Sequence, residues 1–155
     1  MTTRRAIYVV VLAVMVAALL SLSSMEAQMG GDPWTTQQTV QAADLAKELS
    51  SGKAAPTVLF VGYQRLYGAG HIKGAEFHGS GGSAEGLAEI KKWAEPQSRK
   101  TNLVIYCGCC PMERCPNVGP PFLALREMGF TKMRVLILPT SFAVDWADKG
   151  LPYER

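Results

Sequence analysis

The chain has 155 residues, enough for one domain, and its formal net charge at pH 7 is +3. Lysine and arginine are interspersed with aspartate and glutamate, without the basic block or the aromatic–basic pattern that follows a phosphate backbone. We therefore expect no nucleic-acid partner.

The first residues have the pattern of a secretory signal peptide. Arg4 and Arg5 precede an apolar stretch, and the small-residue pattern Ser21-Leu22-Ser23 follows it as a possible cleavage site. We predict that residues 1–23 are a signal peptide and that the protein is periplasmic or secreted, without stable membrane association after cleavage. The alternative is an uncleaved anchor formed by residues 6–22, at the short limit of a membrane span of roughly 17–25 residues.

The next part of the chain alternates between polar and apolar segments. Residues 24–38 are rich in glycine, proline and polar side chains and are predicted to be a linker. Apolar residues at helical spacing predict a helix over 41–50, with Gly52 as its stop. The elements expected next are a buried strand at 57–61, a glycine-punctuated turn at 68–74 and a short strand at 75–78.

The second half of the chain repeats this alternation. Ser83 is the expected N-cap of a helix that ends at Trp93. A strand is predicted at 103–106, a helix with Pro120 and Pro121 in its first turn up to Gly129, a strand at 133–138 and a last helix over 141–150. Strands that alternate with helices predict an α/β fold in which a parallel central sheet is covered by helices on both faces, with residues 39–155 as the domain.

All four cysteines of the chain fall within nine residues, directly after the predicted strand at 103–106. They are Cys107, Cys109, Cys110 and Cys115. Functional sites of open parallel sheets form at the carboxyl ends of the strands, so we expect the chemistry in this loop.

Three roles are open for the clustered thiols. A disulfide within so short a loop restricts the unfolded chain only modestly, so stapling of the whole domain is a poor explanation. A local disulfide between Cys115 and another of the four is more plausible than one between the adjacent Cys109 and Cys110, which would be strained. Thiolates also bind Cu(I) and Zn(II), so all four cysteines are alternative metal ligands, although zinc sites usually combine pairs from separate segments.

Four segments together resemble a rhodanese domain. They are Gly70-His71-Ile72-Lys73-Gly74-Ala75, Val104-Ile105-Tyr106-Cys107 with its loop and helix, Leu125 to Phe130, and Trp146 to Pro152. Their order and spacing match the family over roughly residues 41–153. The resemblance implies a three-layer rhodanese-like fold and a sulfurtransferase that forms a cysteine persulfide, with a small sulfur donor, a thiol or cyanide acceptor and no cofactor.

The chain also departs from the family pattern. Phe60 and Gly62 stand where the family usually places an Asp and an Arg, and Ser141-Phe142 replaces a usual glycine pair. The family loop commonly has four residues between its cysteine and a following Arg or Lys, which holds here for Cys109 and Arg114 but not for Cys107.

Position and spacing therefore point to different nucleophiles. We favour Cys107, because it ends the strand at the base of a loop whose backbone N–H groups can stabilise a thiolate, with Arg114 as the candidate cation. Cys109, Cys110 and Cys115 are alternative nucleophiles or relay thiols. A module without activity that holds a redox-active or metal-binding cysteine loop is the alternative function. His71, in a glycine turn, is expected to hold local backbone by hydrogen bonds.

Overall fold

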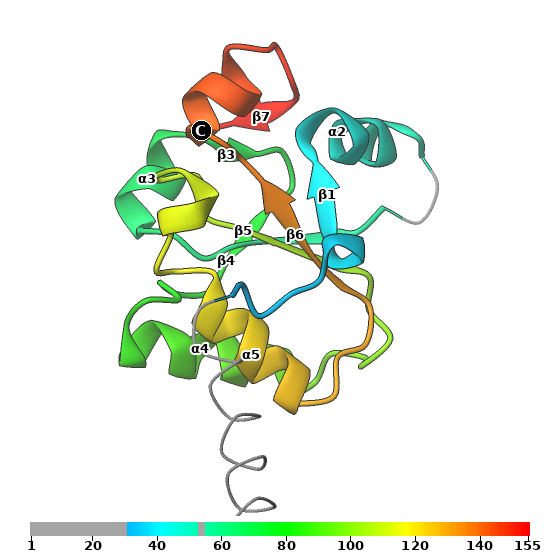
Figure 1. Ribbon diagram of the computed structural model, residues 1–155, viewed down its shortest axis with the longest axis vertical. Coiled ribbons are helices and arrows are strands. Elements are labelled where there is room, and N and C mark those ends of the chain that lie inside the picture. Colours follow the sequence, from blue (N-terminus) through cyan, green and yellow to red (C-terminus); the bar gives the residue numbers. More distant parts are fainter. Residues whose placement is uncertain (1–30, 53–54) are drawn as a thin grey trace, which may run out of the picture. The chain divides into compact units, whose positions relative to one another are not determined.

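A parallel five-stranded sheet forms the centre of the computed structural model, which describes residues 31–52 and 55–155 (Figure 1). The strand order is β1-β6-β5-β2-β4. The strands are β1 (Thr39–Gln41), β2 (Thr57–Phe60), β4 (Glu76–Phe77), β5 (Leu103–Tyr106) and β6 (Met133–Ile137). The predicted signal peptide or anchor and residues 24–30 of the predicted linker lie outside the described residues. Within the described part, no helix combines the length and apolar character needed to cross a membrane.

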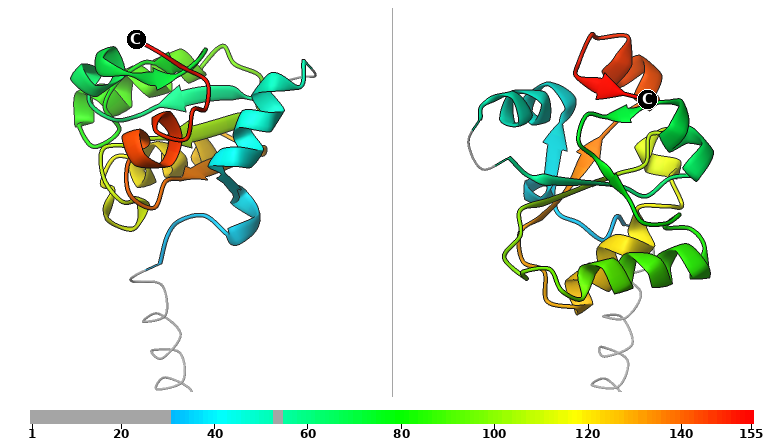
Figure 2. Two further views of the ribbon diagram at one scale, coloured as in Figure 1. Left: turned by 90° about the horizontal axis from the view of Figure 1, so that it is seen from above. Right: turned by 180° about the vertical axis from the view of Figure 1, so that it is seen from behind.

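Helices cover both faces of this sheet because the side chains of its central strand alternate between two cores. Leu103 and Ile105 of β5 pack with α4 (Ala84–Ala94) and α5 (Gly119–Glu127), whereas Val104 and Tyr106 pack on the opposite face. That second core includes residues of α2 (Ala42–Ser50) and of the π-helical turn η4 (Ala143–Ala147). Figure 2 shows the helices on either side of the sheet. The predicted three-layer α/β architecture is confirmed.

Parallel register brings the ends of the central strands to one edge of the sheet. Phe60 at the end of β2 is the partner of Tyr106 at the end of β5. The backbone N–H of Val61 donates to the carbonyl of Tyr106 at 2.8 Å, so the segments that follow β2 and β5 leave the sheet side by side. Cys107 follows directly and therefore begins its loop beside Gly62.

A second, two-stranded sheet packs near this edge. It pairs β3 (His71–Ile72) with β7 (Tyr153–Glu154) in antiparallel register. The hydroxyl of the buried Tyr106 accepts a hydrogen bond from the backbone N–H of Ile72 at 2.9 Å, which ties the small sheet to β5.

Most predicted elements are present, and the differences concern short ones. The predicted turn at 68–74 is partly wrong, because a helix, α3 (Gln64–Ala69), runs into it and β3 follows. α3 has only six residues and none of them is fully buried; Leu66 and Tyr67 pack against the core in part, which is too short a pattern for periodicity to reveal. The last helix is shorter than predicted and limited to η4. Ser83 does cap α4, accepting a hydrogen bond from Gly86 N at 3.0 Å.

The residues just before β1 pack against the domain. Pro33–Arg155 forms one compact unit, and η2 (Thr36–Gln38) leads directly into β1. The rings of Trp34 and Phe122 pack edge to face, with their centroids 5.5 Å apart, and Arg126 donates to the carbonyl of Pro33 at 3.0 Å. The end of the segment predicted as linker therefore contributes to the packing of α5.

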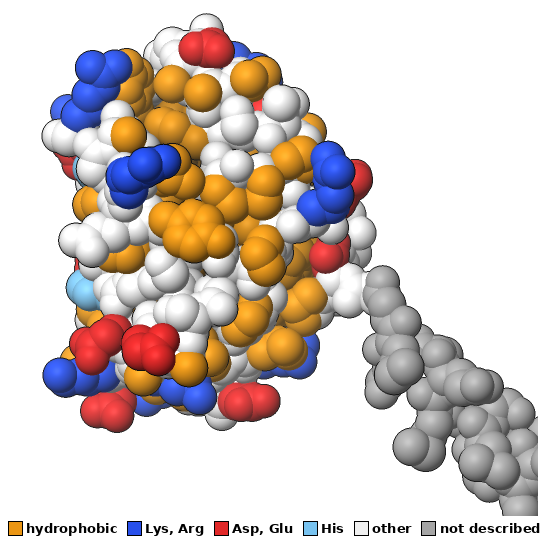
Figure 3. Space-filling view, turned by 90° about the vertical axis from the view of Figure 1, so that its left-hand side faces the viewer, with side chains coloured by type: hydrophobic (Ala, Val, Ile, Leu, Met, Phe, Trp, Pro, Cys, Tyr) orange, Lys and Arg blue, Asp and Glu red, His pale blue; other side chains and the backbone are white. Residues whose placement is uncertain are grey.

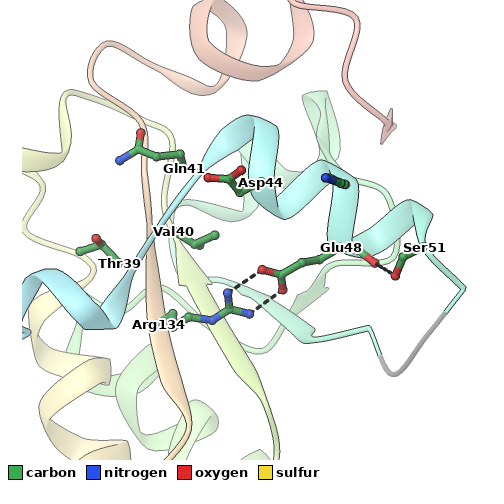
Figure 4. Close-up of a pocket in the computed structure, with 8 residues that line it drawn as sticks. Thr39, Val40, Gln41, Asp44, Glu48, Ser51 and Arg134 are labelled. Carbon is green, nitrogen blue, oxygen red and sulfur yellow. Dashed lines mark hydrogen bonds and ion pairs between the residues drawn. The ribbon is translucent and has the colours of Figure 1, made fainter.

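A bidentate ion pair joins α2 to the sheet in a surface pocket (Figure 4). Arg134 of β6 donates to both carboxylate oxygens of Glu48, each at 2.7 Å. The hydrogen bond from Arg134 lowers the pKa of Glu48, and the same bond raises the pKa of Arg134. The pocket has no thiol among its lining residues, so we assign this pair a structural role.

Candidate active site

Cys107 begins the loop at the carboxyl end of β5, and its side chain is only 1% exposed. Gly108 then turns the chain with a φ of 73°, a conformation that favours glycine. The turn also needs a residue without a side chain, because a Cβ on Gly108 would lie 2.7 Å from the Cβ of Phe142. The backbone N–H of Phe142 donates to the carbonyl of Gly108 at 3.0 Å and closes this contact.

The loop gathers its thiols into a chain of contacts. The Sγ atoms of Cys107 and Cys109 are 3.1 Å apart, and those of Cys109 and Cys110 are also 3.1 Å apart. The sulfur atoms of Cys107, Cys109 and Cys115 all lie within 4.8 Å of one another. All four cysteines are free thiols, and Cys107 is the most buried of them.

Asn117 is a further residue of the site. It is 1% exposed, and its Nδ2 lies 3.4 Å from the sulfur of Cys107 and 3.7 Å from that of Cys109. Gly81 and Gly82 leave room for Asn117, because a Cβ on either would strike it. Asn117 is not among the site residues predicted from the sequence; the signal that could have pointed to it is the run of small residues at 79–82.

Hydrogen bonds make Cys107 the acidic thiol of the group. A bond from the Cys115 thiol, followed by bonds from Cys109 and Asn117, lowers the pKa of Cys107 to about 6 despite its burial. Burial and the bond to Cys107 raise the pKa of Cys109 to about 12. The bond to Cys107 and burial also raise the pKa of Cys115. One thiolate is thus surrounded by thiols that stay protonated and act as donors.

Arg114, the predicted cation, is exposed at the end of the short helix η3 (Met112–Arg114). The lowered pKa of Cys107 comes from thiol, amide and backbone donors, and Arg114 is not among them. The role predicted for Arg114, as the cation that favours the thiolate, stays a prediction. Cys110 is half-buried and contacts Cys109 rather than Cys107.

A cavity of about 390 Å³ lies beside Cys107. Cys107 and Cys109 both line it, whereas Cys110 and Cys115 do not. Four segments supply its larger apolar side chains: Phe60 comes from β2, Leu66 from α3, Phe142 from the residue just before η4, and Tyr153 from β7. Figure 3 shows the side of the molecule that carries α3, where hydrophobic side chains gather across the middle of the face and charged ones surround them.

Two other polar residues near this edge have structural roles. Asp145 is only 5% exposed. Its carboxylate accepts hydrogen bonds from the backbone N–H groups of Thr140 at 2.6 Å and Ser141 at 2.9 Å, and these bonds fix the segment before Phe142. The Nδ1 atom of His71 lies 2.9 Å from the carbonyl oxygen of Tyr67, and the two side-chain rings stack with their centroids 3.8 Å apart. This contact is the backbone role predicted for His71.

Comparison with known proteins identifies the architecture. No family model and no curated protein matches the sequence. Among solved structures, the chain is similar to the rhodanese-like domain of the Alr3790 protein from Anabaena sp. in its solution NMR structure, with a TM-score of 0.55 and 22% identity over 76% of this chain and 78% of that one. A crystal structure of Alr3790 gives a TM-score of 0.54 and 22% identity over 74% of this chain and 81% of that one. The fold is rhodanese-like.

At this level of identity the likeness concerns the fold, and activity has to be argued from the site. Gly62 shows how this rhodanese-like chain differs from the usual family pattern beside Cys107. A Cβ on Gly62 would lie 2.6 Å from the Phe60 ring and 3.1 Å from the sulfur of Cys107. The Phe60 side chain thus occupies space beside the thiol, at a position where the family usually has a carboxylate.

Proposed function

We propose that the protein is a sulfurtransferase that moves a sulfane sulfur from a thiosulfate-like or persulfide donor to a thiol or cyanide acceptor. One observation carries the proposal. The sulfur of Cys107 lines an accessible cavity, lies 3.1 Å from the sulfur of Cys109 and accepts a hydrogen bond from the Asn117 amide at 3.4 Å. Such an environment favours the thiolate, which is the reactive form.

The chemistry requires two transfers on the same sulfur. The Cys107 thiolate attacks the outer sulfur of the donor, the donor's S–S bond breaks, and its electron pair leaves with sulfite or a thiolate. The terminal sulfur of the resulting Cys107 persulfide is then attacked by the acceptor, which regenerates the thiolate. Neither transfer needs an external oxidant, and Cys109 and Asn117 can donate to the anion at each stage.

Intact-mass analysis after incubation with excess thiosulfate tests this proposal. The reduced domain should gain the mass of one sulfur atom, and cyanide should remove it. Cys107→Ser should abolish the gain, whereas Cys110→Ser, a matched change at a thiol that does not line the cavity, should retain it. If Cys107→Ser still gains sulfur and Cys109→Ser does not, the nucleophile is Cys109.

A rhodanese-like module without activity is the second candidate, and the three sulfur atoms within 4.8 Å favour it. Cys107, Cys109 and Cys115 would be the ligands of a soft metal such as Cu(I), with Cys110 outside the group. A bound metal would occupy Cys107 and leave no thiolate to attack a donor. Near-stoichiometric metal that survives dialysis, with no transferable sulfur after reduction, would support this candidate.

The same crowding supports a redox-active loop. We expect air-oxidised protein to contain a disulfide within the loop and to be inactive, because Cys107 would be consumed or blocked. The contact between Cys107 and Cys109 is the closest one that involves the proposed nucleophile. Reduction should then restore sulfur transfer.

A further inference from the structure

The cavity beside Cys107 has the lining of a site for an apolar group. Phe60, Leu66, Phe142 and Tyr153 supply its larger side chains, and small residues of α3 and η4 complete it. Its volume of about 390 Å³ lies within the range of small-molecule sites, roughly 300–1,000 Å³. A five-atom inorganic anion such as thiosulfate would leave much of this space empty.

The charges of the lining give no strong preference for a dianion. Of the described residues that line the cavity, Asp148 and Arg155 are the charged ones, both exposed and of opposite sign. Arg114 does not line the cavity. Two negative charges moved from water against aromatic rings would lose hydration without a matching pair of cations.

From this lining we infer that the physiological donor is an organic sulfane compound whose apolar body, a ring or larger, packs against the walls of the cavity while its terminal sulfur meets Cys107. The inference rests on the proposed sulfurtransferase function and names its substrate class. Thiosulfate would react by the same chemistry, but without the binding free energy that the apolar walls supply.

Thiosulfonates provide stable probes of this idea. The Cys107 thiolate attacks the terminal sulfur of R–SO₂–S⁻ and forms a new S–S bond. The bond between that sulfur and the sulfonyl sulfur breaks, and its electron pair leaves with the sulfinate R–SO₂⁻. One persulfide anion and one sulfinate anion replace one thiolate and one thiosulfonate anion, so charge and electrons balance.

The test compares the rate constants with which benzenethiosulfonate and methanethiosulfonate load sulfur onto Cys107, followed by intact mass. These donors share the reacting group and differ in the apolar body. We expect the benzene compound to load roughly tenfold faster or more, on the scale by which apolar pockets discriminate such groups. Thiosulfate should be slower than the benzene compound.

Two adjacent exposed residues of η4 provide a matched pair of variants. Ala143 lines the cavity, and Val144, 46% exposed, does not. Ala143→Leu narrows the cavity and should reduce the ratio of the two rate constants severalfold, whereas Val144→Leu should keep the wild-type ratio. Ala69→Leu narrows the cavity from α3 and should repeat the effect if Ala143→Leu disturbs η4.

The possible failures are distinct. Equal loading by the two thiosulfonates, or a ratio that neither Ala143→Leu nor Ala69→Leu changes in folded protein, would overturn the inference about the donor. Absence of sulfur on Cys107 with every donor would instead overturn the proposed function itself.

Discussion

Cys107 combines deep burial with a lowered pKa, two properties that normally oppose each other. Burial of a thiol in apolar surroundings raises its pKa, because it disfavours the anion. Here donors from Cys115, Cys109 and Asn117 outweigh that penalty, in that order. The neighbouring thiols therefore act as hydrogen-bond donors to the nucleophile, whether or not they also carry sulfur.

At the scale of single residues, the first prediction is the pH dependence of Cys107 reactivity. The thiolate fraction grows as pH rises through the pKa, so the rate of alkylation by iodoacetamide should rise with a midpoint near pH 6 and level off at higher pH. Alkylation of Cys107, followed by peptide mass spectrometry, measures this profile. A midpoint near the ordinary thiol value of about 8.5 would show that the loop does not stabilise the anion.

The second prediction concerns the amide of Asn117. Asn117→Ala removes one donor and should raise the pKa of Cys107, slowing its alkylation at pH 6 by roughly two- to tenfold, the effect of one hydrogen bond to a charged group. At pH 9, where the thiolate forms in either protein, the difference should shrink. Equal slowing at both values of pH would indicate a purely structural role.

Sequence could identify the thiols but not their most buried donor. Cys107 stands out because it directly follows an apolar strand, and Cys109 because four residues separate it from Arg114. Asn117 is one amide in a loop rich in proline and glycine, and it reaches the thiols only because the 79–82 segment leaves room beneath it. That contact joins segments about thirty-five residues apart, so local pattern cannot reveal it.

At the scale of elements, the turn at Gly108 connects the thiol loop to the segment that carries Phe142. The left-handed φ and the hydrogen bond from Phe142 N together fix where the Phe142 ring lies relative to the cavity. The cavity wall thus depends on a glycine in the nucleophile's own loop.

Gly108→Ala should accordingly destabilise the domain and slow sulfur loading. The left-handed conformation alone costs an alanine about 1 kcal/mol, and the contact with the Cβ of Phe142 adds to it. Gly52→Ala is the control, because Gly52 has a φ of 66° but open space around its missing Cβ. Thermal unfolding should show a greater loss of stability for Gly108→Ala than for Gly52→Ala, and the rate of sulfur loading should fall only in Gly108→Ala. Equal losses in the two variants would argue against the contact with Phe142.

Long apolar elements were predictable, whereas of the short strands only β4 was, within the strand predicted at 75–78. The strands β2, β5 and β6 are continuous apolar runs, and α4 has both a capping serine and helical periodicity. β1, β3 and β7 have two or three residues each and depend on partners distant in sequence. Their formation is decided by the assembled sheet rather than by local preference.

At the scale of the whole molecule, the compact unit begins at Pro33, and Trp34 contributes to its packing on α5. Removal of residues 1–23 would therefore leave the described domain complete. We predict that the mature chain begins near Ser24 and is recovered outside the cytoplasm, as expected from Arg4, Arg5 and the apolar stretch after them. N-terminal sequencing of fractionated cells checks this, and membrane-bound protein that still begins at Met1 or Thr2 would favour the anchor.

The hydrogen bond from Ile72 N to the Tyr106 hydroxyl joins the two strands that lead to the cavity lining. Tyr106 precedes the nucleophile, and Ile72 is the register partner of Tyr153, which lines the cavity. A movement of the small sheet away from the thiol would break this buried bond and leave both partners without water to replace it. A buried hydrogen bond thus ties the strand that ends before Cys107 to the small sheet that carries Tyr153. Under the proposed function, the width of the cavity is therefore set before a donor arrives, and the donor is selected by its shape.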